Sequence, residues 1–296
     1  MDAIKVGGHL SVAGGYHNAL TKTKEIGGNC VQIFSSSPRS WQPFVPTDEI
    51  ITKFVETKKQ LEIDPVYFHA SYLINLANPD WGGSQSVTTL IQELTLAQKM
   101  GVKGTIIHLG SFKNKPARNA MQSVAGGEGS ATQEQYSVLF KNISKVLENT
   151  PTDTLFIAEN AGNRKIGWSL DELGIIVKTI ADPRVKICID TCHAHAAGYD
   201  LSTAEKFEQF WTTFDEKIGM DRLEVFQIND SKDLLGSFRD RHENIGEGTI
   251  PQSTFRLLMN HSLTKSKPML LEVPGEDKKG PDAKNIAVLQ EFLEEH

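Results

Sequence analysis

Histidine, aspartate and glutamate side chains stand at or just beyond the ends of several short apolar runs in this chain. They are His69, His108, Glu159, Asp190, His193 and Glu272, and two more, Asp240 and His242, lie in the loop segment GSFRDRHENIG. Mixed imidazole and carboxylate groups are ligands for zinc, manganese or iron. Carboxylates gathered in one poorly solvated pocket repel one another unless cations neutralise them. Since the set exceeds the roughly three or four ligands that one ion takes from a protein, it indicates more than one divalent ion.

This combination of side chains favours hydrolysis of a phosphoester. Clustered divalent ions stabilise charge on a transferring phosphoryl group and supply hydroxide at neutral pH. The sequence contains neither a G-x-S-x-G nucleophile elbow nor a Walker phosphate-binding loop, each of which would favour a different chemistry. We therefore expect a metal-dependent hydrolase.

Eight apolar runs must bring these side chains together. They span residues 5–9, 30–35, 65–69, 104–108, 154–159, 185–190, 224–227 and 268–272. Segments of helical periodicity separate the runs, which predicts a parallel sheet. Eight such units predict a closed (β/α)8 TIM barrel, an α/β fold, as a single domain over residues 1–296, with its chemistry at the C-terminal ends of the strands. The alternative is a doubly wound open sheet, but GGHLSVAGG is not the dinucleotide-binding fingerprint.

Capping signals mark the helices between the runs. Residues 86–101 have helical periodicity, and Gly101 is the expected C-cap. Ser169 is the expected N-cap of a second helix with acidic residues in its first turn. Residues 134–149 predict a third helix.

The bulk composition predicts a globular cytoplasmic protein. Hydrophobic residues make up 39% of the chain and charged residues 23%, which allows a sizeable core. We find neither an apolar run long enough to span a membrane nor a signal peptide. The three cysteines lie in apolar stretches and cannot all pair, which favours free thiols in a reducing compartment. The net charge of −6 argues only weakly against nucleic-acid binding, because bound cations can hold phosphates on an acidic protein.

The chain resembles the endonuclease IV family of apurinic/apyrimidinic (AP) endonucleases over nearly its whole length. The motifs that carry the resemblance are GGHLSVAGG, PRSW, FHASYLINLA, HLGS, AEN, CIDTCHAHAAGYD, INDSKDLLGSFRDRHENIGEG and LEVP. The resemblance implies a deoxyribonuclease IV-type hydrolase of base excision repair, which acts as a monomer on duplex DNA with abasic sites or blocked 3′ ends. Such an enzyme cuts the phosphodiester 5′ of the abasic site, leaving a 3′-hydroxyl and a 5′-deoxyribose phosphate, and also trims blocked 3′ ends.

The resemblance further implies two or three zinc ions. The ligands would be His69 and His108 for the first ion, Asp190 and Glu272 for the second with Glu159 bridging the two, and His193, Asp240 and His242 for the third. Glu159 and Glu272 are the expected catalytic residues, because a hydroxide held between the ions would attack phosphorus in line.

Four further residues are expected to bind DNA. Arg39 in PRSW and Tyr72 in HASYLINLA match family positions that enter or contact DNA, and a flipped nucleotide leaves a gap that such side chains can fill. Lys113 lies in the long loop after the fourth run, which is either a phosphate-contacting loop or a surface loop. Arg241 stands between two expected metal ligands.

Gln227 departs from the family pattern. The family has a histidine ligand of the second zinc where this chain reads QINDSK. The glutamine offers a neutral oxygen, a harder and weaker ligand than imidazole. Three interpretations remain open: Gln227 ligates manganese or magnesium, it binds a metal-bound water, or the second site is weakened or partly empty.

Two other functions compete with AP endonuclease activity. A sugar isomerase or epimerase on the same barrel would use one or two ions, but it has no need for the third set of ligands at His193, Asp240 and His242. A weakly active binder of damaged DNA, degraded at Gln227, is the other alternative.

Overall fold

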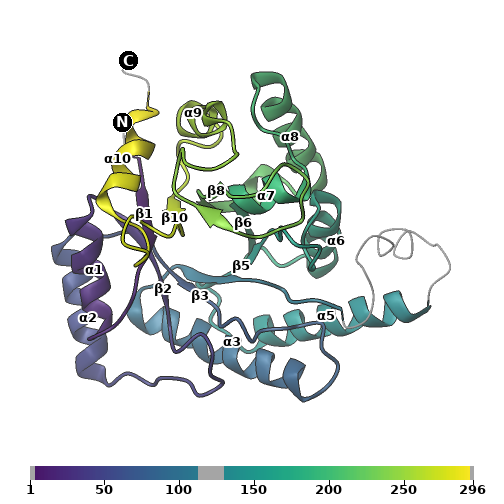
Figure 1. Ribbon diagram of the computed structural model, residues 1–296. Coiled ribbons are helices and arrows are strands. Elements are labelled where there is room, and N and C mark those ends of the chain that lie inside the picture. The colour runs from purple at the N-terminus through teal and green to yellow at the C-terminus, as the bar shows by residue number, and fades with distance from the viewer. Residues whose placement is uncertain (1–3, 113–129, 294–296) are drawn as a thin grey trace.

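The computed structural model describes residues 4–112 and 130–293, and these form a closed barrel of eight parallel strands (Figure 1). The strands are β1 Val6–His9, β2 Cys30–Phe34, β3 Val66–His69, β4 Gly104–Ile107, β5 Leu155–Glu159, β6 Val185–Asp190, β7 Leu223–Gln227 and β10 Met269–Leu271. Their order around the barrel is β1-β10-β7-β6-β5-β4-β3-β2. Every predicted run contributes a strand, so the predicted (β/α)8 barrel is confirmed.

Helices cover the outside of the barrel (Figure 1). They are α1 Tyr16–Glu25, α2 Asp48–Gln60, α3 Trp81–Met100, α5 Ser130–Glu148, α6 Leu170–Ile180, α7 Thr191–Ala197, α8 Ala204–Lys217, the 3-10 turn η2 Met220–Arg222, α9 Gln252–Asn260 and α10 Ala283–Glu291. Gly101 ends α3 in the left-handed conformation, and the Ser169 side chain accepts a hydrogen bond from Glu172 N at the start of α6. Both predicted caps are therefore confirmed.

A small antiparallel hairpin lies outside the barrel. It pairs β8 Asp230–Ser231 with β9 His242–Glu243. The hairpin is short, but it brings His242 back beside the residues that follow β7. Within the described residues, no helix is long and apolar enough to cross a membrane.

One apolar layer fills the barrel interior. It consists of Cys30, Tyr67, Ile106, Ile157, Cys188, Val225 and Leu270, all fully buried. β1 contributes Gly7 beside this layer, where a Cβ would lie 1.7 Å from Cys30 O, so only glycine fits. The three cysteines are free and buried, as predicted.

Candidate metal centre at the mouth of the barrel

Five of the eight expected His, Asp and Glu ligands belong to a ring one step beyond the apolar layer. Side chains two residues apart in a strand point to the same face, so each inward residue of the layer predicts another inward residue two positions later. In order around the barrel, this ring is His9, Glu272, Gln227, Asp190, Glu159, His108, His69 and Gln32. The ring contains six groups that can ligate metals strongly and two glutamines. Sequence analysis did not assign His9 and Gln32, although the same alternation places them here.

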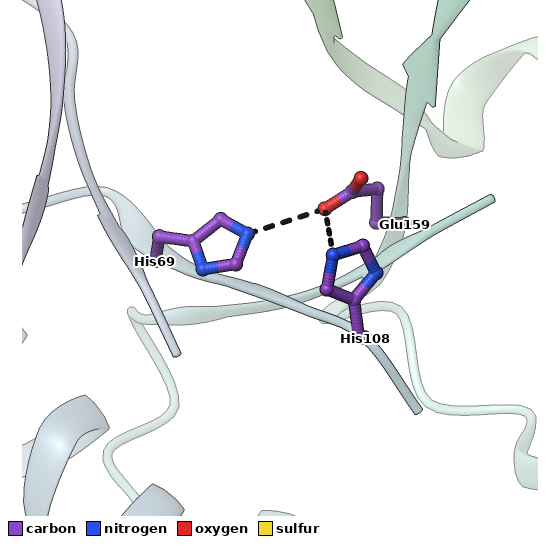
Figure 2. A group of neighbouring side chains, drawn as sticks. All are labelled: His69, His108 and Glu159. Carbon is purple, nitrogen blue, oxygen red and sulfur yellow. Dashed lines mark hydrogen bonds and ion pairs between the residues drawn. The ribbon is translucent and has the colours of Figure 1, made fainter. Parts of the chain in front are cut away.

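The first group centres on Glu159, which is fully buried at the end of β5 (Figure 2). Glu159 Oε2 lies 3.3 Å from His69 Nε2 and 3.6 Å from His108 Nε2. On the opposite side, Glu159 Oε1 lies 3.0 Å from His193 Nδ1. One carboxylate thus faces imidazoles from three elements, an arrangement suited to bridging two cations.

The second group joins the end of β6 to the outer hairpin. Asp190 caps α7 by accepting from His193 N at 2.8 Å, which fixes the start of the helix that carries His193. Asp190 Oδ2 lies 3.5 Å from His242 Nε2. Asp240 Oδ1 lies 3.0 Å from His193 Nε2 and 3.5 Å from His242 Nε2. The side chains of Asp190, His193 and His242 can therefore surround an ion, and so can those of Cys192, Asp240 and His242.

Three of the histidines are oriented by backbone carbonyl groups. His69 Nδ1 lies 2.8 Å from Ala70 O, and His193 Nδ1 lies 2.9 Å from Asn160 O. His242 Nδ1 lies 3.3 Å from Glu272 O. A carbonyl accepts only from a protonated nitrogen, so each Nδ1 carries a proton, and Nε2 is the nitrogen that is left to bind a metal ion.

Charge interactions and burial compete in setting the ionisation of these groups. Burial would lower the pKa of His69, but the hydrogen bond to Glu159 and the charges of Glu272 and Glu159 raise it to about 9. Burial would raise the pKa of Glu272, but the hydrogen bond and charge of His9 hold it at about 2. Burial lowers the pKa of His108 to about 4, and the charge of His69 adds to that effect. The carboxylates that hold a proton on His69 could hold a divalent cation in its place.

Unpartnered polar atoms support a fit to metal ions. Within the described residues, Glu159 Oε1, His193 Nε2 and His242 Nε2 are buried and make no hydrogen bond of normal geometry. Each nevertheless lies 3.0 to 3.5 Å from a nitrogen or oxygen atom of another expected ligand. Buried polar groups without hydrogen bonds are costly, and cations placed between them would satisfy all three. The residues present therefore fit divalent ions.

A cleft of about 630 Å³ opens above these groups. Its lining includes His69, His108 and Glu272 from the ring, together with Tyr72 and Lys279 at the rim. The aromatic ring of Tyr72, which is exposed, also lines the cleft.

The expected DNA-binding residues lie in different surroundings. Ser71 Oγ and Tyr72 N both donate to Pro38 O, which ties the loop of exposed Arg39 to the loop of Tyr72. The Arg241 guanidinium forms two hydrogen bonds, of 2.7 and 2.6 Å, with the Asp233 carboxylate, so it holds the loop before β9. Lys113 lies outside the described residues.

Gln227 is fully buried at the ring position of β7. Its Oε1 lies 3.5 Å from Cys188 Sγ, and its Nε2 lies 3.1 Å from Gln32 Oε1. Nearby, Asn229 links two strand ends by donating to Asp190 Oδ2 at 2.6 Å and accepting from Glu272 N at 2.7 Å. This role of Asn229 could not be predicted from the sequence, because the link depends on which strands are neighbours.

Comparison with known proteins places this site in a family context. A family model described as xylose isomerase-like TIM barrel matches residues 20–296. A probable endonuclease 4 from Thermosipho africanus is 36% identical over 280 residues, which cover 93% of this chain and 94% of that protein. The crystal structure of endonuclease IV from Thermus thermophilus matches with a TM-score of 0.81 and 28% identity, over 97% of this chain and 98% of that chain.

A more distant structure shares the fold alone. It is 3-keto-D-glucoside 4-epimerase from E. coli, with a TM-score of 0.69 and 14% identity over 98% of this chain and 100% of that chain.

Proposed function

Because this chain belongs to the endonuclease IV family, within the xylose isomerase-like TIM barrels, we propose that it is a metal-dependent AP endonuclease. It hydrolyses the phosphodiester 5′ of an abasic site in duplex DNA, leaving a 3′-hydroxyl and a 5′-deoxyribose phosphate, and trims blocked 3′ ends. The observation that carries the proposal is Glu159, a buried carboxylate that faces imidazoles from three elements. We further propose that the protein acts as a monomer in the cytoplasm.

The proposed metal ligands follow the two groups described above. They are His69, His108 and Glu159 for one ion, and Asp190, His193, Asp240 and His242 for the other. Glu272, just beyond the end of β10, is a further proposed ligand. Bound divalent ions, most simply zinc, would neutralise phosphate charge and supply hydroxide at neutral pH. The carbonyl-bound Nδ1 atoms keep the imidazoles in the tautomer that can ligate.

Two carboxylates would orient the attacking water. Glu159 and Glu272 are ionised at neutral pH, because neighbouring histidines lower the pKa of each against the effect of burial. An ionised carboxylate accepts hydrogen bonds, so each can hold a water in line with the phosphorus and the leaving 3′ oxygen. Glu272 lines the open cleft, so it can reach a phosphate that enters from solvent.

The rim of the cleft would hold the DNA. Tyr72 is 60% exposed and its ring packs edge-on against Phe34, so it is held in place to stack in the gap left by the abasic nucleotide. Arg39, on the loop that Ser71 and Tyr72 bind, would contact a phosphate. These contacts select DNA over a free sugar.

A defined duplex tests the proposal. The substrate is an oligonucleotide with one tetrahydrofuran abasic analogue, incubated with the full chain and zinc, manganese, magnesium or EDTA. We expect one incision 5′ of the analogue that EDTA abolishes, and no cutting of the undamaged duplex. Absence of incision with every metal would refute the proposal. In that case, conversion of a free ketohexose would support the epimerase alternative, and retained binding to the abasic duplex would support the damaged-DNA binder.

A further inference from the structure

Three neighbours in the ring form a compact polar triangle at the junction of β10, β1 and β2. His9 Nδ1 lies 2.8 Å from Glu272 Oε1 and 2.8 Å from Gln32 Nε2. Gln32 Nε2 and Glu272 Oε1 are also in hydrogen-bond contact. Gln32 is completely buried, whereas His9 and Glu272 line the open cleft. The triangle is therefore part of the barrel interior and can be reached from solvent on one side.

Protons alone cannot make all three contacts of this triangle favourable. If His9 Nδ1 is protonated, it donates to Glu272, but it then opposes the donating amide of Gln32. If Nδ1 is unprotonated, it accepts from Gln32, but its lone pair then opposes the negative Glu272 oxygen. His9 Nε2 is buried and has no hydrogen-bond partner within the described chain. One close contact is repulsive in each case.

Half-turns of two amide groups replace the mixed contacts with three acceptors, whose mutual repulsion a cation between them can remove. A half-turn exchanges the oxygen and nitrogen ends of Gln32 with little change in shape, so its oxygen would face His9 and Glu272. Its nitrogen would then face Gln227, 3.1 Å away. If Gln227 turns in the same way, its oxygen accepts from Gln32 and its nitrogen faces Cys188 Sγ at 3.5 Å. Every amide hydrogen bond between the glutamines is kept, and the triangle becomes three acceptors.

We propose that a divalent cation binds in this triangle, held by His9 Nδ1, the Gln32 amide oxygen and Glu272 Oε1. Ligands bonded at about 2.1 Å and at right angles lie about 3 Å apart, close to the 2.8 Å separations of His9 Nδ1 from its two neighbours. One imidazole with two oxygen ligands suits manganese or zinc. In this arrangement Gln227 is not a ligand; it is a positioning residue that keeps the Gln32 oxygen turned toward the ion.

The inference rests on the proposed function only for the use of this ion in catalysis, so binding can be tested without DNA. The full chain and its variants are loaded with Zn²⁺ or Mn²⁺ and dialysed. Bound metal per chain is then counted by mass spectrometry, and Mn²⁺ affinity is measured by titration calorimetry. Gln32→Leu removes the proposed oxygen ligand and Gln32→Glu replaces it with a carboxylate. Gln60→Leu is the matched control, because Gln60 is exposed at the end of α2.

We expect Gln32→Leu to hold one ion fewer per chain than the wild type and the Gln60→Leu control. Gln32→Glu should keep that ion and lower its Mn²⁺ dissociation constant by about tenfold or more, because a charged ligand replaces a neutral one. Gln227→Leu should still bind the ion, but its Mn²⁺ dissociation constant should rise several-fold, because the Gln32 amide is then free to turn. An unchanged ion count in Gln32→Leu would overturn the proposal.

If circular dichroism shows that Gln32→Leu does not fold, the proposal is tested by the Mn²⁺ affinity of Gln32→Glu alone. Equal or weaker Mn²⁺ binding by that variant would refute the site. Incision of abasic DNA is measured separately on the same samples. Loss of an ion in Gln32→Leu without any incision by the wild type would refute the proposed function and leave this site standing. Incision by the wild type together with an unchanged ion count in Gln32→Leu would support the proposed function and refute this site.

Discussion

Glu93 on α3 is a buried carboxyl group whose charge should make the protein less stable as pH rises. It is 5% exposed, its Oε1 accepts a hydrogen bond from Ser35 Oγ at 2.8 Å, and its Oε2 has no hydrogen-bond partner within the described residues. Burial raises the pKa of Glu93 from 4.5 to about 7, and the hydrogen bond from Ser35 offsets this only in part. The folded protein therefore favours the protonated form.

The sign and size of the effect follow from that difference in pKa. The contribution to stability is fully present below pH 4.5, the unfolded pKa, and is lost as pH rises through the folded pKa of about 7. Each pKa unit corresponds to about 1.4 kcal/mol, so about 3 kcal/mol is the upper limit by pH 8. Glu93→Gln stays neutral at every pH and keeps an acceptor for Ser35. Relative to the wild type, it should gain up to about 3 kcal/mol between pH 4.5 and pH 8.

Urea unfolding at pH 5 and pH 8 measures this gain, with tryptophan fluorescence as the signal and EDTA present throughout. Any fixed cost of burying an amide is equal at both pH values, so it cancels in the difference. Glu56→Gln, at an exposed position on α2, is the control and should show no pH-dependent difference from the wild type. A Glu93→Gln difference that is the same at pH 5 and pH 8 would show that the Glu93 pKa is not raised.

Three further substitutions test the site itself. Glu159→Gln removes the buried charge between the imidazoles and should lower both bound metal and the incision rate, the rate by about 10³-fold or more; a full metal content with normal incision would contradict the assignment. Arg39→Ala should raise KM for abasic duplex and reduce by about one the slope of log KM against log salt; an unchanged slope would place Arg39 away from phosphate. Tyr72→Ala should weaken binding of abasic duplex by about tenfold or more, whereas Tyr72→Phe should bind normally; equal loss in both variants would mean that the hydroxyl, not stacking, matters.

The sequence was sufficient to predict the eight strands, because each was a short apolar run between helical segments. The polar residues at the strand ends were also readable, since inward-facing positions alternate along a strand. The grouping of ligands was harder to predict. Asp240 and His242 approach His193 only because the hairpin of β8 and β9 folds back, and Arg241 forms its ion pair with Asp233 in that same loop. These contacts depend on loop geometry, for which the chain carries no periodic signal.

The interpretation of Gln227 also required the three-dimensional arrangement. From the residue type alone, it was a weak ligand, a partner of water, or a sign of a depleted site. In the structure, its amide is engaged by Gln32 and Cys188. Gln32 was not among the predicted site residues, because it stands inside a strand of apolar residues. Only the pairing of β1 with both β2 and β10 shows that Gln32 and Glu272 flank the same histidine.

The pairing of β1 with β10 also has a consequence for synthesis of the protein. His9 and Glu272 are in direct contact, yet 263 positions separate them in the chain. A ribosome therefore releases His9 well before Glu272. Until β10 pairs with β1, Glu272 is missing from its place beside His9. The triangle of His9, Gln32 and Glu272 is therefore completed only when β10 joins the barrel, so a chain that stops before β10 would lack it.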